Sequence, residues 1–271
     1  MFPASFDYAK GNSVADAVSI LTSVDDAKLL AGGHSLLPLM KLRLATPSML
    51  VDIGSLSELS YIEDKGDYVA IGALTRHHDI QNSRLLKSEV PILPYVASQV
   101  GDPQVRHRGT IGGSISHGDG ASDLPAAALA LDARLVLVGP TGERVIPATE
   151  FFVGFLETVM SPDELLTEVR VSKFSGGWSF QKFNRRAQDW AIVGVAAVND
   201  GNTRVSLVNM GPTPLRASAV EEALMGGASI EAASKKASEG LDPPEDLNAS
   251  SRYRRHLAEV LTRRALTEAL G

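Results

Sequence analysis

The chain is organised around the stretch Arg108-Gly109-Thr110-Ile111-Gly112-Gly113-Ser114-Ile115-Ser116-His117-Gly118-Asp119-Gly120-Ala121-Ser122-Asp123-Leu124-Pro125, which contains five glycines. Glycine permits positive φ angles and lets another group approach backbone N–H donors closely. The alanine-rich run 126–131 follows, a strong helix former with a proline near its first turn. A glycine-rich turn that leads into a helix is typical of a site for an anion, usually a phosphate. A tight turn with a purely structural role is the alternative.

A second stretch has the same character. Leu29-Leu30-Ala31-Gly32-Gly33-His34-Ser35-Leu36-Leu37-Pro38-Leu39-Met40 runs from an apolar strand through glycines into an apolar helical pattern. Neither stretch contains the G-x-x-x-x-G-K-[ST] motif of a P-loop or the G-x-G-x-x-G fingerprint of a dinucleotide-binding Rossmann fold. We therefore expect two separate glycine turns that hold one diphosphate from both sides.

These motifs are those of a known family. Ala31 to Ser35 and Thr110 to Gly113, together with Asp119 and the run 121–125, resemble the FAD-binding medium subunit of molybdenum hydroxylases. The carbon monoxide dehydrogenase type is the most similar, within the wider group of vanillyl-alcohol-oxidase-like flavoproteins. The resemblance covers essentially the whole chain, and both motifs occur in the right order.

The resemblance implies an α+β protein. It predicts a two-subdomain, PCMH-type FAD-binding fold, followed by a C-terminal domain of a three-stranded antiparallel sheet plus helices. The expected boundaries are 1–56 for FAD-binding subdomain 1, 57–175 for FAD-binding subdomain 2 and 176–271 for the C-terminal α+β domain.

Local patterns in the N-terminal half predict individual elements. Apolar residues at 14, 17, 18 and 21 indicate a helix, with Ser13 as its N-cap. Strands are expected at 28–31, 50–53 and 165–171, and hairpins at 61–73 and 134–146. Helices are expected at 75–82 and 89–100.

The C-terminal part reads as strands followed by helices. Strands are expected at 178–184, 192–199 and 204–210, and helices at 215–224, 230–237 and 251–270. The five arginines of the last helix are expected on a solvated face, with a docking surface for an acidic partner as the alternative.

Composition limits the function. The 44% apolar and 21% charged content is that of an ordinary globular protein. A net charge of −6 argues against non-specific nucleic-acid binding. No run of about 18 apolar residues is present, so no membrane span is expected. The first eight residues do not resemble a signal peptide, so a cytoplasmic location is expected.

The absence of cysteine decides where other redox groups must be. With no thiolate in this chain, iron–sulfur ligation and covalent cysteinyl flavin are both excluded. Any iron–sulfur clusters must belong to a partner polypeptide. FAD is expected to be held here non-covalently, since no histidine stands in a recognisable attachment context either.

The family also implies the site. The expected cofactor-binding residues are Leu29, Leu30, Ala31, Gly32, Gly33, His34, Ser35, Thr110, Ile111, Gly112, Gly113, Ser114, Asp123, Leu166, Lys182 and Trp190, with no catalytic residue and no metal ligand. In this interpretation, backbone N–H groups and hydroxyls hold the diphosphate and Asp123 accepts a hydrogen bond from a cofactor hydroxyl. The alternative for Asp123 is an N-cap, and the alternative for Lys182 is a solvated strand residue.

Two residues depart from the family pattern, and several others suggest roles outside it. Many relatives have asparagine where Ser114 stands, and carbon monoxide dehydrogenase relatives have tyrosine at Trp190. His117, Asp119 and Asp123 lack a closed metal-ligand set. His77-His78 is expected to lie on a polar helix face. A Gly112→Asp substitution, which would place a carboxylate beside the diphosphate, is expected to abolish FAD retention without unfolding the chain.

The implied function is that of an electron-transfer flavoprotein subunit. Electrons would arrive from [2Fe–2S] clusters on a small partner subunit, after substrate oxidation at the molybdenum cofactor of a large one, in an (αβγ)₂ assembly. The alternatives are a stand-alone FAD-dependent oxidoreductase and a cofactor-free interaction module of the same fold. The sequence names neither the substrate (carbon monoxide, a purine, an N-heterocycle or an aldehyde) nor the terminal acceptor.

Overall fold

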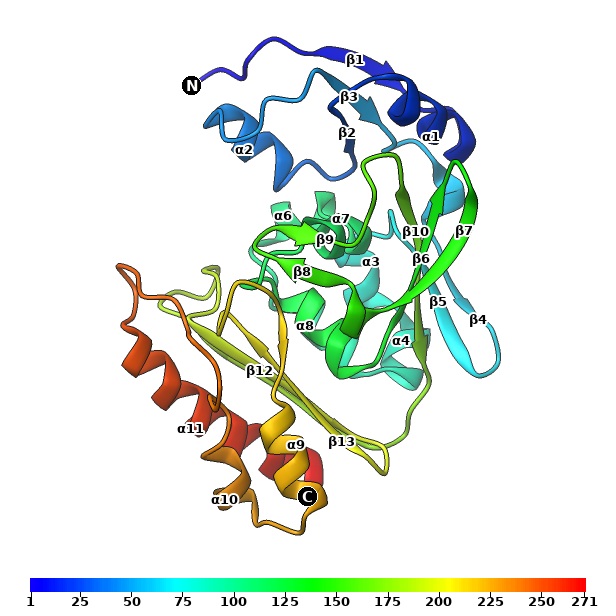
Figure 1. Cartoon of the computed structure of the whole chain (residues 1–271). Coiled ribbons are helices and arrows are strands. Elements are labelled where there is room, and N and C mark those ends of the chain that lie inside the picture. Colours follow the sequence, from blue (N-terminus) through cyan, green and yellow to red (C-terminus); the bar gives the residue numbers. More distant parts are fainter.

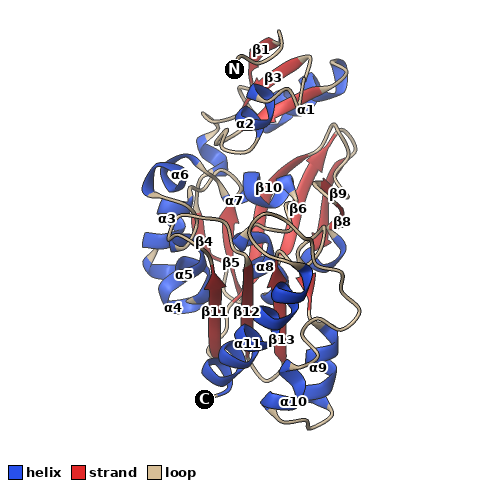
Figure 2. Cartoon of the chain, turned by 90° about the vertical axis from the view of Figure 1, so that its left-hand side faces the viewer, coloured by secondary structure: helices blue, strands red, loops and turns tan.

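A computed structural model describes residues 1–271, and it arranges the chain around three main sheets that follow one another in sequence (Figure 1). Figures 1 and 2 both place the first sheet with its two helices at one end of the molecule and the last three helices at the other. This is the α+β architecture that the sequence predicts.

The first sheet is parallel and has the order β1-β3-β2. Its elements are β1 (Asp7–Lys10), α1 (Val14–Ser23), β2 (Ala27–Leu30), α2 (Leu36–Lys41) and β3 (Met49–Asp52). The predicted helix after Ser13 is confirmed: Ser13 Oγ accepts a hydrogen bond from Asp16 N–H, and Ala17, Val18 and Leu21 are buried. Strand β1 was not predicted from the sequence.

The second sheet is antiparallel and has the order β4-β5-β10-β6-β7. Its strands are β4 (Ile62–Asp64), β5 (Tyr68–Gly72), β6 (Arg134–Gly139), β7 (Gly142–Pro147) and β10 (Leu165–Ser172), which confirms both hairpins. Six helices lie between β5 and β6 in the chain: α3 (His77–Asn82), α4 (Arg84–Glu89), α5 (Ile92–Ser98), α6 (Pro103–Arg108), α7 (Ile111–His117) and α8 (Asp123–Ala130). Two small 3-10 turns, η1 (Ser57–Leu59) and η2 (Ala148–Glu150), and the hairpin of β8 (Phe152–Gly154) with β9 (Glu157–Thr158) complete this part.

The glycine-rich stretch 108–125 is a helix over much of its first half. Thr110 is the N-cap of α7, because its Oγ1 accepts a hydrogen bond from Gly113 N–H at 3.1 Å. The helix ends at Gly118, which has a φ of 66°. The segment is therefore more regular than a turn.

The third sheet has four strands rather than the three predicted, in the order β11-β12-β13-β14. The elements here are β11 (Gly177–Phe183), β12 (Val193–Asn199), β13 (Thr203–Val208), β14 (Leu215–Arg216), α9 (Ser218–Met225), α10 (Ile230–Ser234) and α11 (Ser251–Leu270). The extra strand takes the first two residues of the predicted helix 215–224, because Leu215 pairs with Leu207 of β13. Helix α11 packs across β11 and β12 through Leu257, Leu261 and Ala265.

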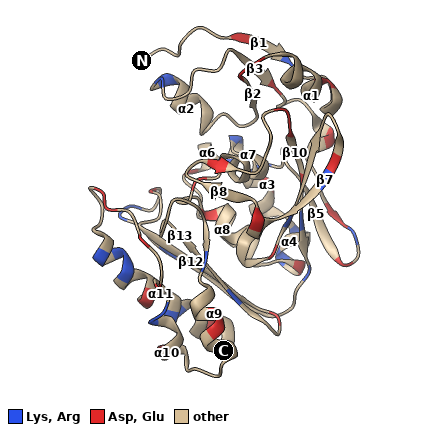
Figure 3. Ribbon diagram, viewed as in Figure 1, with Lys and Arg blue, Asp and Glu red and all other residues tan.

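Most, but not all, of the arginines on α11 face solvent. Several basic residues lie along this helix, where the ribbon is blue (Figure 3). Arg254 is the exception to the expected solvated face: it is fully buried, donates to Ile192 O and pairs with Asp246 at 2.7 Å. No helix of the structure is both long and apolar enough to cross a membrane.

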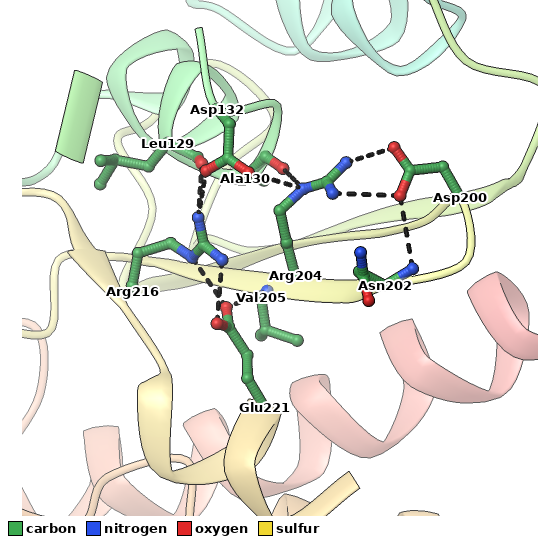
Figure 4. A network of polar contacts seen from close by, with 9 residues as sticks. All are labelled: Leu129, Ala130, Asp132, Asp200, Asn202, Arg204, Val205, Arg216 and Glu221. Carbon is green, nitrogen blue, oxygen red and sulfur yellow. Dashed lines mark hydrogen bonds and ion pairs between the residues drawn. The ribbon is translucent and has the colours of Figure 1, made fainter. Parts of the chain in front are cut away.

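Helix α8 is held by the third sheet at its C-terminal end (Figure 4). Arg216 donates to Leu129 O and pairs with Asp132 and Glu221. Arg204 donates to Ala130 O at 2.9 Å. Cations near the last carbonyls of a helix satisfy acceptors that have no partner within the helix. The two arginines therefore fix the position of α8 on the third sheet.

Candidate functional site

A cavity of about 850 Å³ lies where residues of the first, second and third sheets meet. A volume of this size accommodates a large cofactor. All of the predicted site residues line it except Ile111, which is buried in the apolar core.

The first glycine motif is an open turn, residues 31–36, which runs from the end of β2 to the first residue of α2. None of the backbone N–H groups of these residues donates to an acceptor within the protein. Gly33 makes the turn with a φ of 78°, a conformation that side chains other than glycine rarely adopt. A run of unpaired N–H groups in a glycine turn is an anion-binding feature. The open turn is thus the strongest donor array in the cavity wall.

The second glycine motif does not offer free backbone N–H donors, because its N–H groups are already paired within the protein. Ile111 N–H donates to Thr75 O, and Gly112 N–H donates to Ala73 O at 2.9 Å. Gly113 and Ser114 N–H are used by the Thr110 cap. These N–H groups therefore cannot hold a diphosphate while these bonds exist, whereas the half-buried Ser114 hydroxyl has no partner within the protein.

The two glycine motifs touch each other. A Cβ added to Gly32 would lie 2.3 Å from Arg108 O and 3.0 Å from the Cα of Gly109. Real Cβ atoms do not come this close, so glycine at position 32 allows the two backbones to meet.

The geometry at Gly112 contradicts one part of the expectation for Gly112→Asp, that the chain keeps its fold with the new carboxylate beside the diphosphate. A Cβ on Gly112 would point at Ala73, 2.5 Å from its Cβ and 2.7 Å from its carbonyl oxygen. Because the side chain would enter the packed backbone instead of the cavity, the substitution disrupts the fold.

Asp123 and Lys182 form a buried ion pair in the cavity wall. Lys182 Nζ lies 2.6 Å from Asp123 Oδ2 and also donates to Gln99 O at 2.9 Å. Burial raises the pKa of the Asp123 carboxyl, and the nearby Lys182 partly opposes that rise. Neither alternative role fits, because Ser122 occupies the N-cap position and Lys182 is buried. Asp123 lines the cavity, and its Oδ1 is buried without a partner, so it is an acceptor that the protein itself leaves unsatisfied.

The remaining predicted residues lie at separate walls. Leu29 and Leu30 are half-buried at the end of β2, and Leu166 is buried on β10. Trp190, in the loop between β11 and β12, is 58% exposed although it lines the cavity. His34 is an exposed member of the open turn.

His77 was missed as a member of the site. It does not lie on a polar face: it is 4% exposed, lines the cavity, and its Nδ1 has no partner. Adjacent histidines give no such signal in sequence, because burial depends on how α3 packs. His117 also lines the cavity, and burial lowers its pKa. Asp119 caps its own turn by accepting from Ala121 N–H, and the structure contains no cluster of three or more metal-ligating side chains.

The residues present fit FAD. The open turn offers donors to a diphosphate, and Asp123 Oδ1 offers a buried acceptor to a hydroxyl or N–H group. The leucines and Trp190 offer apolar walls for a ring system.

Comparison with known proteins agrees with this geometry. Residues 4–173 match the family model "FAD binding domain in molybdopterin dehydrogenase", and residues 178–269 match "CO dehydrogenase flavoprotein C-terminal domain". The carbon monoxide dehydrogenase medium chain of Hydrogenophaga pseudoflava is 42% identical, over 99% of this chain and 98% of that one. The 6-hydroxypseudooxynicotine dehydrogenase complex subunit alpha of Paenarthrobacter nicotinovorans is 38% identical, over 100% and 96%.

Solved structures show the same fold. A chain of the H. pseudoflava carbon monoxide dehydrogenase superposes with a TM-score of 0.95, covering 100% of this chain and 99% of that one at 42% identity. A chain of quinoline 2-oxidoreductase from Pseudomonas putida 86 gives a TM-score of 0.92 at 31% identity, covering 99% and 98%.

Proposed function

This chain belongs to the FAD-binding medium subunits of the molybdenum hydroxylases, and from that premise we propose that it is the electron-transfer flavoprotein of a heteromeric oxidoreductase. In this proposal it receives electrons from [2Fe–2S] clusters on a small subunit and passes them to an external acceptor. A large subunit carries the molybdenum cofactor, and the assembly is (αβγ)₂.

One observation carries the proposal: residues 31–36 of the open turn line a cavity of about 850 Å³, and none of their backbone N–H groups has an acceptor within the protein. Within this proposal the turn holds the diphosphate and Ser114 adds a hydroxyl contact. FAD, when bound, supplies two-electron chemistry that no side chain of this protein can provide.

The lack of cysteine supports placing the iron–sulfur clusters on a partner subunit and only the flavin on this chain. Iron–sulfur clusters need cysteine thiolates, and this chain has none. The chain's own part is then to bind and orient the flavin and to set the charge around it. Asp123 is assigned as an acceptor to the cofactor, and Lys182 holds its carboxylate in place.

The first experiment is a visible absorption spectrum of the purified full chain, with the heat-released supernatant compared with FAD and FMN. We expect oxidised-flavin bands and FAD in the supernatant. A chain that stays colourless after incubation with FAD would contradict the proposal and favour the cofactor-free interaction module.

A matched pair of variants tests the open turn. Gly33→Ala and Gly66→Ala both place alanine at a positive φ, of 78° and 83°, but only Gly33 lies at the cavity. Both incur a cost of about 1–2 kcal/mol for the left-handed backbone. Gly33→Ala also brings its Cβ within 2.8 Å of Leu37 Cδ1, whereas Gly66→Ala meets no neighbour, so FAD retention is compared under conditions in which both variants are folded. Only Gly33→Ala is expected to lose FAD, and equal FAD retention by the two variants would remove the turn from the site.

The heteromeric part needs its own test. A tagged copy expressed in the native host is expected to co-purify with two polypeptides, one containing molybdenum and the other iron and acid-labile sulfide. A chain that purifies alone and oxidises a substrate would instead support the stand-alone oxidoreductase.

A further inference from the structure

His77 lies beside the backbone segment on which the two glycine motifs meet. The backbone N–H of His77 donates to Gly109 O at 3.0 Å. The ring is also close to Gly109, since a Cβ built on Gly109 would lie 2.7 Å from His77 Nε2. Gly109 in turn packs against Gly32 of the open turn. Gly109 is therefore the residue that lies between the imidazole and the open turn in the cavity wall.

The two ring nitrogens of His77 differ in their surroundings. Nδ1 is buried without a hydrogen-bond partner, whereas Nε2 is not among the buried unpartnered atoms, and His77 lines the cavity. A proton on Nδ1 would be a buried donor with no acceptor, which is costly. The tautomer with the proton on Nε2 leaves Nδ1 as a buried acceptor without a donor, but it places the N–H on the nitrogen that is not sealed, where a bound group can accept from it.

Burial lowers the pKa of His77 to about 4, and the nearby His34, Arg76 and Arg106, which are cationic or potentially cationic, add to this fall. The ring is therefore neutral at neutral pH, and it contributes a donor without adding a charge that would need compensation.

We propose that His77 Nε2–H is a donor to the cofactor diphosphate, a contact that completes the open turn from the side of α3. The inference rests on the proposed function, because the anion it addresses is the diphosphate of FAD. It accounts for a nearly buried histidine that makes no side-chain hydrogen bond within the protein.

The test compares three variants of the full chain by titration with FAD, ADP and riboflavin. His77→Phe removes the donor, and His77→Gln places an amide N–H near the position of Nε2. His78→Phe is the control, because His78 stacks on His107 at 4.0 Å and does not line the cavity. ADP contains the diphosphate, whereas riboflavin lacks it.

We expect His77→Phe to bind FAD and ADP about 10- to 100-fold more weakly than the native chain, with riboflavin unchanged. His77→Gln is expected to stay within about threefold of the native affinity, because the amide restores the N–H donor. His78→Phe is expected to stay within the same limit, because His78 does not line the cavity. Native-like binding of FAD and ADP by folded His77→Phe would overturn the inference, as would an equal loss for riboflavin.

A second measurement is read on the native chain, and a variant serves only to assign its signal. Histidine-selective ¹⁵N NMR of the native chain, with His77→Gln used to assign the signal, is expected to show an Nε2-protonated neutral ring whose proton shifts downfield on ADP addition. An unshifted or Nδ1-protonated His77 would overturn the inference. If the native chain binds neither FAD nor ADP, the proposed function fails first. FAD binding with an indifferent His77→Phe removes only the role of His77.

Discussion

Lys182 Nζ and Asp123 Oδ2 lie 2.6 Å apart, and both side chains are only 6% exposed. The pair joins the first residue of α8 to β11 of the third sheet, across the wall of the cofactor cavity. Arg216 and Arg204 hold the other end of the same helix (Figure 4). Helix α8 is thus fixed to the third sheet at both ends, and the orphaned Asp123 Oδ1 is presented from a rigid support.

Removal of Lys182 should expose the cost of the buried carboxylate. We expect Lys182→Met to lose about 3–5 kcal/mol of unfolding free energy, because Asp123 would remain buried without its counter-charge. The double variant Asp123→Asn with Lys182→Met should recover part of that loss. Urea denaturation monitored by circular dichroism measures the unfolding free energy of the two single variants, Lys182→Met and Asp123→Asn, and of the double variant. If the double variant is as unstable as the sum of the two single variants, the residues are not coupled.

A carboxylate placed in the open turn should compete with the cofactor. Ser35 is the N-cap residue of α2, but its side chain makes no capping hydrogen bond. Ser35→Asp is expected to keep or raise the melting temperature, since aspartate is a good N-cap. It should also lower the amount of FAD that co-purifies, because its charge repels a diphosphate. Full retention of FAD, measured by absorbance after heat release, would argue against diphosphate binding at this turn.

The sequence predicts the large elements well because they depend on local patterns. The spacing of Val14, Ala17, Val18 and Leu21 is enough to define α1. Strand β14 is beyond such reasoning: Leu215 and Arg216 continue a helical pattern, and only pairing with β13 makes them a strand. The same limit applies to β1, whose pairing with β3 is distant in sequence.

The candidate site could likewise be predicted from the sequence only where local residue patterns define it. Glycines and hydroxyl residues mark both motifs, but which N–H groups remain unpaired depends on the partners that folding brings to them. Ala73 and Thr75 occupy the donors of the second motif, and neither is near it in sequence. The direction of a Cβ at Gly112 and the burial of His77 depend equally on tertiary packing.

The arginine network at the end of α8 should contribute more than an exposed ion pair. Arg216 makes two hydrogen bonds to Glu221, at 2.7 and 2.9 Å, and also contacts Leu129 O. Arg216→Lys cannot keep this forked geometry, and we expect a loss of about 2 kcal/mol in urea unfolding. Arg186→Lys is the control, since Arg186 is 83% exposed in its pair with Asp189 and should cost less than about 0.5 kcal/mol. Equal effects would show that the fork adds no stability.

His77 gives the protein a defined pH dependence. Its pKa is about 4 when folded, against 6.5 for an unperturbed histidine, so between these values the unfolded chain binds one more proton than the folded chain at this residue. Stability therefore falls as the pH drops from 6.5 to 4, by about 1.4 kcal/mol per pH unit and about 3 kcal/mol in total, and this contribution is constant above pH 6.5. His77→Phe, which has no titrating group, should lose less stability over the same window, whereas titrating carboxylates act alike in both proteins. Urea midpoints at half-unit pH steps measure the difference between the two proteins. Parallel curves would mean that His77 takes up its proton as readily in the folded chain as in the unfolded one.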